Sequence, residues 1–327
     1  MKNSSHKLAA TERRNPRSRS LDQMSTRELL EIINQEDRRV PGAVARELGP
    51  IASAVEAIAK SIERGGRLIY VGAGTSGRLA ALDAAECPPT FGVSSRLVQA
   101  VVAGGRRALT RAAEGAEDSA PRGARDLRAR QIGARDIIVG VTASGGTPYV
   151  LGALRFARTR GAKTVLLTSN RNSPARRSAD ITIAPQTGPE VIAGSTRMKA
   201  GTAQKLILNM LSTGAMIRLG RVYNNWMVDL SMTNAKLRSR GLRILEEAAG
   251  ASAPEAKRAL AQSGSLRVAL VMLKTGKSAS EARRWLQRTA ANSWQALGAD
   301  QVHRPAQLRS RRAAKVASRK KAPQRKA

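Results

Sequence analysis

The chain has 327 residues, of which 42% are hydrophobic and only 2% are aromatic, so its core must be built from aliphatic side chains, as in buried parallel strands flanked by helices. The single cysteine, Cys87, excludes an internal disulfide framework and suits a reducing compartment, so we expect a cytoplasmic protein. The two histidines, His6 and His303, lie in polar termini, which excludes a His/Cys zinc cluster; we expect no metal and no cofactor.

The net charge of +33 is concentrated at the chain ends. Residues 301–327 carry ten basic side chains and no acid, and we expect a disordered basic tail; residues 1–20 show a weaker version of the same pattern. Such a tail could contact nucleic acid or an anionic membrane by counterion release, although a solvated extension is the preferred interpretation. The N-terminus has no apolar signal-peptide core, and the apolar stretch 206–219 is too short to span a bilayer.

Residues 21–57 are predicted to form an N-terminal helical segment. Ser25 and Glu28 have the spacing of a capping box, and apolar residues follow at intervals of three and four from 44 to 62. The main α/β domain is expected at 58–221. A helical C-terminal region is expected at 222–300, where Gly250 ends one helix and Ser252 can cap the next.

Short apolar runs alternate with helical patterns in the α/β domain. The predicted strands cover residues 68–71, 97–102, 137–141, 164–168 and 181–183. The predicted helices cover residues 76–86, 106–117, 148–160 and 199–219. This alternation predicts a doubly wound parallel sheet, whose ligand lies beyond the carboxyl ends of the strands.

A glycine-rich loop, Gly72–Gly77, follows the first strand and matches the G-x-G-x-x-G dinucleotide fingerprint. That fingerprint also requires an acidic residue about 20 positions later, and residues 95–102 contain none. The loop instead carries Gly74, Thr75 and Ser76. A second loop at a later strand end carries Ser144, Gly145 and Thr147. Hydroxyls and helix N-terminal amides at two strand ends indicate a cradle for one phosphate monoester, although plain turn and capping chemistry would use the same residues.

Two groups of acidic residues are candidates for chemistry. Glu86 precedes Pro88 and Pro89, which are expected to end the helix and fix the glutamate at a rigid turn. Glu117 lies in the acidic cluster 114–118 within an otherwise basic chain. Because isolated acids at helix ends are usually solvated, the residues alone leave a catalytic and a structural interpretation open.

The longer motifs resemble those of the N-acetylmuramic acid 6-phosphate etherases over about residues 11–300. They are Gly72–Arg78, Asp83–Thr90, Glu114–Ser119 and Gly188–Lys205, with Thr11–Asn15 and Met227–Arg240 beyond the sheet. Members of this family have the sugar isomerase (SIS) fold with a small helical C-terminal region, and mammalian glucokinase regulatory protein is a binding relative. The resemblance therefore implies an SIS-type fold and a homodimer.

The resemblance also implies a lyase that cleaves the D-lactyl ether of N-acetylmuramic acid 6-phosphate during peptidoglycan recycling. By motif, Glu86 is the expected proton donor and Glu117 the second catalytic glutamate, most simply the base. The 188–205 block implies further substrate or phosphate contacts from Glu190, Ser195, Arg197 and Lys199. Gly146 stands where members of the family often have arginine.

Two other functions share the fold. A sugar-phosphate sensor would lack the chemistry, and the presence of both glutamates argues against it. A phosphosugar isomerase also needs proton transfer at C2, and only the identity of the product distinguishes it.

Overall fold

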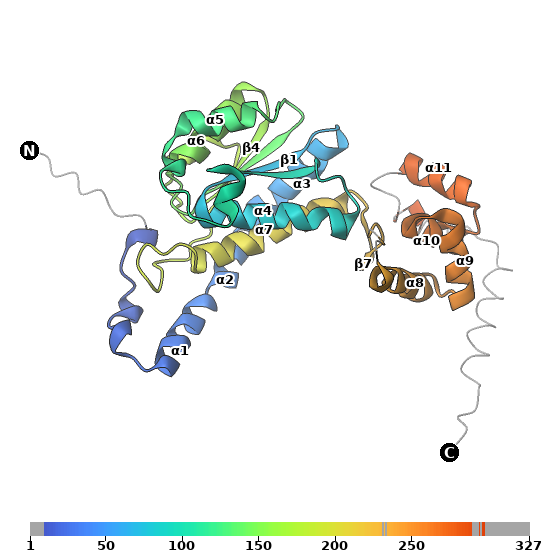
Figure 1. Cartoon of the computed structure of the whole chain (residues 1–327), viewed down its shortest axis with the longest axis horizontal. Coiled ribbons are helices and arrows are strands. Elements are labelled where there is room, and N and C mark those ends of the chain that lie inside the picture. Colours follow the sequence, from blue (N-terminus) through green and yellow to red (C-terminus); the bar gives the residue numbers. More distant parts are fainter. Residues whose placement is uncertain (1–9, 231, 233, 290–293, 295, 298–327) are drawn as a thin grey trace, which may run out of the picture. The chain divides into compact units, whose positions relative to one another are not determined.

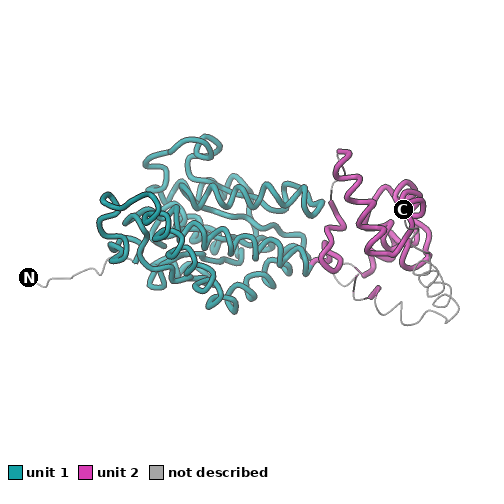
Figure 2. The backbone as a smooth tube through the Cα atoms, turned by 90° about the horizontal axis from the view of Figure 1, so that it is seen from below, with its two compact units in different colours: residues 1–218 teal, residues 219–327 magenta. Residues whose placement is uncertain are grey.

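The computed structural model describes residues 10–230, 232, 234–289, 294, 296 and 297. The chain divides into two compact units, residues 1–218 and 219–327, coloured separately in Figure 2. The α-helices and strands of the first unit are α1 (Thr26–Asp37), α2 (Val40–Ala45), α3 (Leu48–Glu63), β1 (Leu68–Gly72), α4 (Gly74–Phe91), β2 (Val98–Val102), α5 (Ala120–Arg128), β3 (Ile137–Val141), α6 (Pro148–Thr159), β4 (Lys163–Leu167), β5 (Ile181–Ile183) and α7 (Lys199–Arg218). Those of the second unit are β6 (Val222–Tyr223), β7 (Trp226–Met227), α8 (Ala235–Ala249), α9 (Ala253–Ser263), α10 (Leu266–Thr275) and α11 (Ala279–Thr289).

Among the described residues, five parallel strands form one sheet in the order β2-β1-β3-β4-β5. Every residue of β1 and β3 is buried, as expected for strands covered by helices on both faces. β1 pairs with β2 on one side and with β3 on the other. The predicted doubly wound parallel sheet is confirmed, and its strand order reverses between β1 and β3.

Helices cover both faces of the sheet (Figure 1). Ile69 and Val71 of β1 point to one face, where they belong to a buried cluster that includes Leu127 of α5 and Leu154 of α6. Tyr70, between them, points to the other face and donates a hydrogen bond to Asp83 of α4. α7 packs against both α3 and α4 on that face.

α5 and α6 approach closely because each has a glycine at the contact. A methyl group on Gly123 of α5 would lie 2.0 Å from the carbonyl oxygen of Tyr149, and one on Gly152 of α6 would lie 2.0 Å from that of Ala120. Real Cβ atoms cannot occupy such positions, so the two backbones are in direct contact.

The N-terminal segment differs from expectation. The Ser25/Glu28 capping box at α1 is present, as the spacing predicts. Disorder of residues 1–20 is wrong for the described part, residues 10–20, which form short 3₁₀ turns, η1 (Ala10–Glu12) and η2 (Pro16–Ser18). Thr11 and Asn15 are buried, although the segment has no apolar periodicity, and each has a hydrogen-bond partner far along the chain. The Thr11 oxygen accepts from the Gly194 N–H, and Asn15 donates to the Pro189 oxygen.

Two further local predictions need correction. The helix expected at 106–117 is instead two 3₁₀ turns, η4 (Gly105–Leu109) and η5 (Ala116–Asp118), interrupted by Gly115 with φ +68°. A left-handed residue cannot continue an α-helix. In the second unit, where no strand was expected, β6 and β7 form a short antiparallel hairpin with Asn224 at φ +55°.

Capping residues stand at both ends of α8, α9 and α10 and at the start of α11. Gly250 ends α8 in the left-handed conformation, and a capping box of Ser252 and Glu255 begins α9, as predicted. None of the helices among the described residues is long and apolar enough to cross a membrane. The predicted basic tail, 301–327, lies outside the described residues.

Gly123→Ala is expected to lower the free energy of unfolding by about 1–3 kcal/mol, because the added methyl group forces α5 away from α6. Gly42→Ala is a matched control in the exposed surface of α2, where an added methyl meets no atom within 4 Å. That substitution should raise stability by about 0.5–1 kcal/mol. Urea unfolding followed by circular dichroism measures both, and equal effects would contradict the close approach.

Candidate functional site

The two predicted phosphate loops flank the point where the strand order reverses. Gly72–Gly77 follows β1, and the loop from Thr142 to Thr147 follows β3, the strand beside it. In doubly wound sheets the crevice at this switch point is the usual ligand site, because adjacent connections leave in opposite directions.

The first loop places an uncapped helix N-terminus at this point. Gly74 begins α4 with φ +52°, and no side chain caps the helix at Ala73. The first intrahelical hydrogen bond runs from the Gly77 N–H to the Ala73 oxygen, at 3.1 Å. The N–H groups of Gly74, Thr75 and Ser76 therefore point out of an 18-residue helix, which is the arrangement that binds an anion.

In the second loop, several polar groups form hydrogen bonds with one another. The Thr142 hydroxyl bonds the Thr147 hydroxyl at 2.8 Å and accepts from the Gly145 N–H at 3.2 Å. The Gly146 N–H donates to the Ser144 hydroxyl, which can still donate its own hydrogen. This loop has fewer free amides than the first, so its contribution to a ligand is the half-buried hydroxyl of Ser144.

Unpaired polar atoms lie at the same edge. The Ser169 hydroxyl, after β4, and the Thr187 hydroxyl, after β5, are buried, and neither has a hydrogen-bond partner among the described residues. Buried polar groups nearly always have partners, so these two hydroxyls indicate space for water or a polar ligand.

The N-terminus of α7 reaches the first loop. A methyl group on Gly201 would come within 3.6 Å of Thr75 Cγ2 and 3.8 Å of Leu79 Cδ1. Two helix N-termini, those of α4 and α7, therefore lie side by side. Ser195 and Arg197 precede α7 at this place; Ser195 is half-buried, and Arg197 is exposed.

Glu190 and Lys199, expected to contact substrate, have internal partners in this structure. The Glu190 carboxylate accepts from the N–H groups of Lys199 and Ala200, both at 2.9 Å, and so caps α7. Burial raises the pKa of Glu190, an effect partly offset by these two bonds. The Lys199 ammonium, 1% exposed, pairs with Glu36 of α1 at 2.5 Å.

Glu36 and its neighbour Asn15 were not identified as functional from the sequence. Asn15 donates to Glu36 at 2.9 Å. It lies within the family-like motif Thr11–Asn15, and this motif was the one feature of the sequence that could have identified it. Glu36 gave no signal, because an acid in a helix is ordinarily solvated.

The two candidate catalytic glutamates lie in different places. Glu117 is exposed in η5, where its neighbour Ala116 packs in the same cluster as Ala73 and Ala103, which follow β1 and β2. Glu117 therefore belongs to the carboxyl edge of the sheet, beside the first loop.

Glu86 does not stand at a proline-stopped turn. α4 continues through Pro88 and Pro89 to Phe91, where Gly92 caps it and donates to the Pro88 oxygen. The prolines remove backbone hydrogen bonds near the helix end, but their fixed φ is compatible with a helix. Glu86 is an exposed residue, and on a straight helix it stands about 18 Å along the axis from Gly74.

Asp83 holds this part of α4 in place. Its buried carboxylate accepts from Tyr70 of β1 at 2.8 Å and from Ser212 of α7 at 3.0 Å. Burial raises the pKa of Asp83, and the two hydrogen bonds oppose that rise. The motif residue Asp83 is thus an anchor between a strand and two helices.

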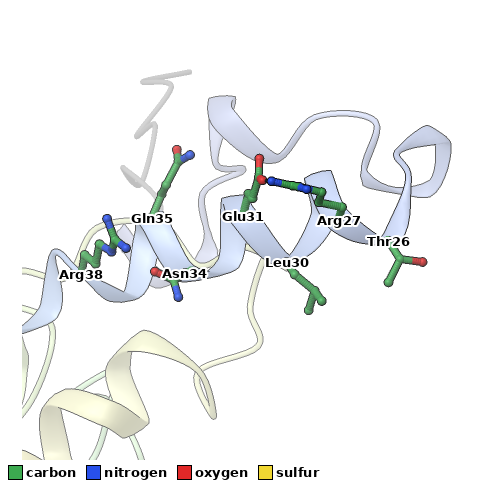
Figure 3. A pocket seen from close by; sticks show the side chains of 7 residues that line it. All are labelled: Thr26, Arg27, Leu30, Glu31, Asn34, Gln35 and Arg38. Atoms are coloured by element: carbon green, nitrogen blue, oxygen red, sulfur yellow. The ribbon is translucent and has the colours of Figure 1, made fainter.

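A groove of about 620 Å³ runs along α1 (Figure 3). It is lined by residues of α1 and by the C-cap Arg38, and the exposed Leu30 is among them. None of the predicted site residues lines it.

Residues 50–158 match the family model described as the glucokinase regulatory protein N-terminal SIS domain. The chain is 52% identical over 279 residues to the N-acetylmuramic acid 6-phosphate etherase of Serratia proteamaculans, covering 85% of this chain and 94% of that protein. It has the same identity to the enzyme of that name from Yersinia pestis, with 95% of that protein covered. A phosphoheptose isomerase structure from Francisella tularensis is similar at a TM-score of 0.45, with 17% identity over 59% of this chain and 98% of that chain.

The parallel sheet and the family match define an SIS-domain protein. Within that class, the chain belongs to the N-acetylmuramic acid 6-phosphate etherase family, as its motifs predict.

Thr75→Val is expected to weaken binding of a hexose 6-phosphate about tenfold or more, because a hydrogen bond to a charged oxygen contributes about 1.5–3 kcal/mol. Valine keeps the methyl group that faces Gly201, so the helix contact is retained. Ser53→Ala, which removes an exposed hydroxyl bonded to Gly49 within α3, is the control. Isothermal titration calorimetry gives both affinities, and an unchanged Kd for Thr75→Val would show that the Thr75 hydroxyl does not contact the phosphate.

Proposed function

We infer that this chain is an etherase that cleaves the D-lactyl ether of N-acetylmuramic acid 6-phosphate and yields N-acetylglucosamine 6-phosphate and D-lactate. The observation that carries this inference is 52% identity over nearly the full length of enzymes with that name. The uncapped α4 N-terminus at the strand-order reversal supports a phosphorylated substrate. We propose a cytoplasmic enzyme of peptidoglycan recycling that requires no metal or cofactor.

The proposed reaction is an elimination followed by addition of water. Glu117 removes the C2 proton of the open-chain aldehyde, and the electron pair forms a C2–C3 double bond as the C3–O bond breaks. Glu86 gives a proton to the departing lactate oxygen. Water then adds its hydroxyl group to C3 and a proton to C2, so that only water is consumed. A carboxylate base and a carboxylic acid can divide these steps.

The amides of Gly74, Thr75 and Ser76 would hold the phosphate, with the Ser144 hydroxyl and the Gly145–Thr147 turn on its other side. Ser195 and Arg197 precede the neighbouring α7 N-terminus and can reach the sugar. Glu190 and Lys199 contribute by holding that N-terminus, because their side chains are buried.

Glu117→Gln should abolish both lactate release and exchange of the C2 hydrogen with solvent deuterium, with losses of about 10²–10⁴-fold. Glu86→Gln should impair lactate release more than exchange, because the proton can leave while the ether bond stays intact. Proton NMR and a lactate assay separate the two steps.

Glu114→Gln is the matched control, since it removes a neighbouring exposed acid that has no assigned role. The reverse pattern in the two catalytic variants would exchange the roles of Glu86 and Glu117. Absence of lactate from the unaltered protein, with a rearranged sugar as product, would indicate an isomerase; binding without turnover would indicate a sensor.

Glu86 is too far from its own phosphate loop to act there. Five covalent bonds join the phosphorus to C3 of a hexose 6-phosphate, which span about 7 Å at most. The separation of about 18 Å along α4 exceeds this span and the reach of one glutamate side chain. We therefore propose that Glu86 serves the site of a second copy in a homodimer.

Exposed apolar side chains next to Glu86 support this pairing. Leu82, one turn earlier on α4, is 45% exposed, and Met210 and Ile217 of the adjacent α7 are 36% and 50% exposed. Large apolar side chains on adjacent helices are typical of surfaces that a partner covers. The basic tail is proposed to be a solvated extension with no part in the main function.

Mixing the two inactive variants tests the shared site. In a dimer of one Glu86→Gln and one Glu117→Gln subunit, one site keeps both glutamates if Glu86 acts across the interface. Random exchange should then restore roughly one quarter of the activity of the unaltered protein, because half of the dimers are mixed and each has one intact site. If Glu86 acted within its own subunit, mixed dimers isolated with two affinity tags would stay inactive.

A further inference from the structure

The N-terminal residues 10–18, here called the strap, lie on the loop that leads into α7. The Gly194 N–H donates to the Thr11 oxygen at 3.1 Å. Asn15 donates to the Pro189 oxygen at 3.3 Å, and Ser18 donates to the Val191 oxygen at 2.6 Å. The strap therefore bonds the loop at three places along 189–194, and the partners in two of these bonds are 174 and 173 positions apart in the chain.

A buried charge network fastens the strap to α7. Glu36 of α1 accepts from both Asn15 and Lys199, and the side chains of Glu36 and Lys199 are each 1% exposed. Arg17 of the strap and Arg39 lie 3.7 and 3.4 Å from the other carboxylate oxygen. Burial alone would raise the pKa of Glu36, but the hydrogen bonds from Lys199 and Asn15 outweigh it and the pKa is lowered. A buried carboxylate needs such partners to remain charged.

The network ends at the candidate site. Lys199 is the first residue of α7, and its own N–H is held by Glu190. Two residues further on, Gly201 faces Thr75 of the phosphate loop. Ser195 and Arg197 lie between the strap-bonded part of the loop and this helix start. The position of the substrate-facing segment 195–199 thus depends on contacts from Asn15, Ser18 and Glu36, none of which reaches the phosphate loop itself.

We propose that Asn15, Ser18 and Glu36 are positioning residues, which set the segment 195–199 and the α7 N-terminus against the phosphate loop for binding of the sugar phosphate. This inference rests on the proposed function for the identity of the ligand. The strap acts on the binding step, because its bonds end on the loop and on α7, whereas Glu117 is carried by η5 at another strand end.

Asn15→Ala tests the proposal with the product N-acetylglucosamine 6-phosphate as the probe. We expect the Kd by calorimetry and the KM for the substrate each to rise about tenfold, while kcat changes less than threefold. Ser25→Ala is the matched control: it removes the α1 capping box without touching the loop and so lowers thermal stability alone. Unchanged affinity in Asn15→Ala, with a lowered Tm, would overturn the proposal.

Two further variants separate positioning from general loss of structure. Ser18→Ala should weaken product binding, and Ser18→Thr, which keeps the hydroxyl, should restore it. The effects of Asn15→Ala and Ser195→Ala on Kd should be less than additive, because both act through one segment; additive effects would refute that route. If the unaltered protein binds the product but releases no lactate, the proposed reaction fails while the binding results still decide the role of the strap.

Discussion

The buried carboxylate of Asp83 is the contact on which the arrangement of the site depends. It accepts hydrogen bonds from Tyr70 of the central strand β1 and from Ser212 of α7, while it is itself part of α4. One side chain thereby ties together a strand and the two helices whose N-termini meet at Thr75 and Gly201. Replacing either hydroxyl would leave a buried acid with one partner fewer, which is costly in a site of low polarity.

Local pattern was sufficient for much of the fold. The strands β1 and β3 lie where short apolar runs bounded by turn residues predict them, because buried parallel strands need continuous apolar sequence. The loops at Thr75 and Ser144 were identifiable for a related reason: glycine and hydroxyl residues at strand ends are required by the turn that follows. In these places, the sequence signal and the physical cause involve the same few neighbouring residues.

The remaining features depend on contacts that local pattern does not encode. The proline pair in α4 is typical of a helix stop, yet the helix continues to Phe91, and the turn before the prolines is held through Asp83. The motif predicts that Lys199 contacts an anionic substrate. Its ammonium instead pairs with Glu36, which is 163 residues away in the chain. The proposed roles of Glu86 and Glu117 came from resemblance to a family. The helix predicted at 76–86 already separated Glu86 from its own loop, but the single sequence did not show that this helix continues through the prolines to Phe91.

The free amides at the start of α4 have a consequence for selectivity. They offer hydrogen-bond donors and a helix dipole, and neither distinguishes a sugar phosphate from inorganic phosphate or sulfate. If these amides hold the substrate phosphate as proposed, any small tetrahedral oxyanion competes for the same place. On that proposal, discrimination has to come from groups that contact the sugar, so that the phosphate end supplies affinity and the other end of the ligand decides which molecule is accepted.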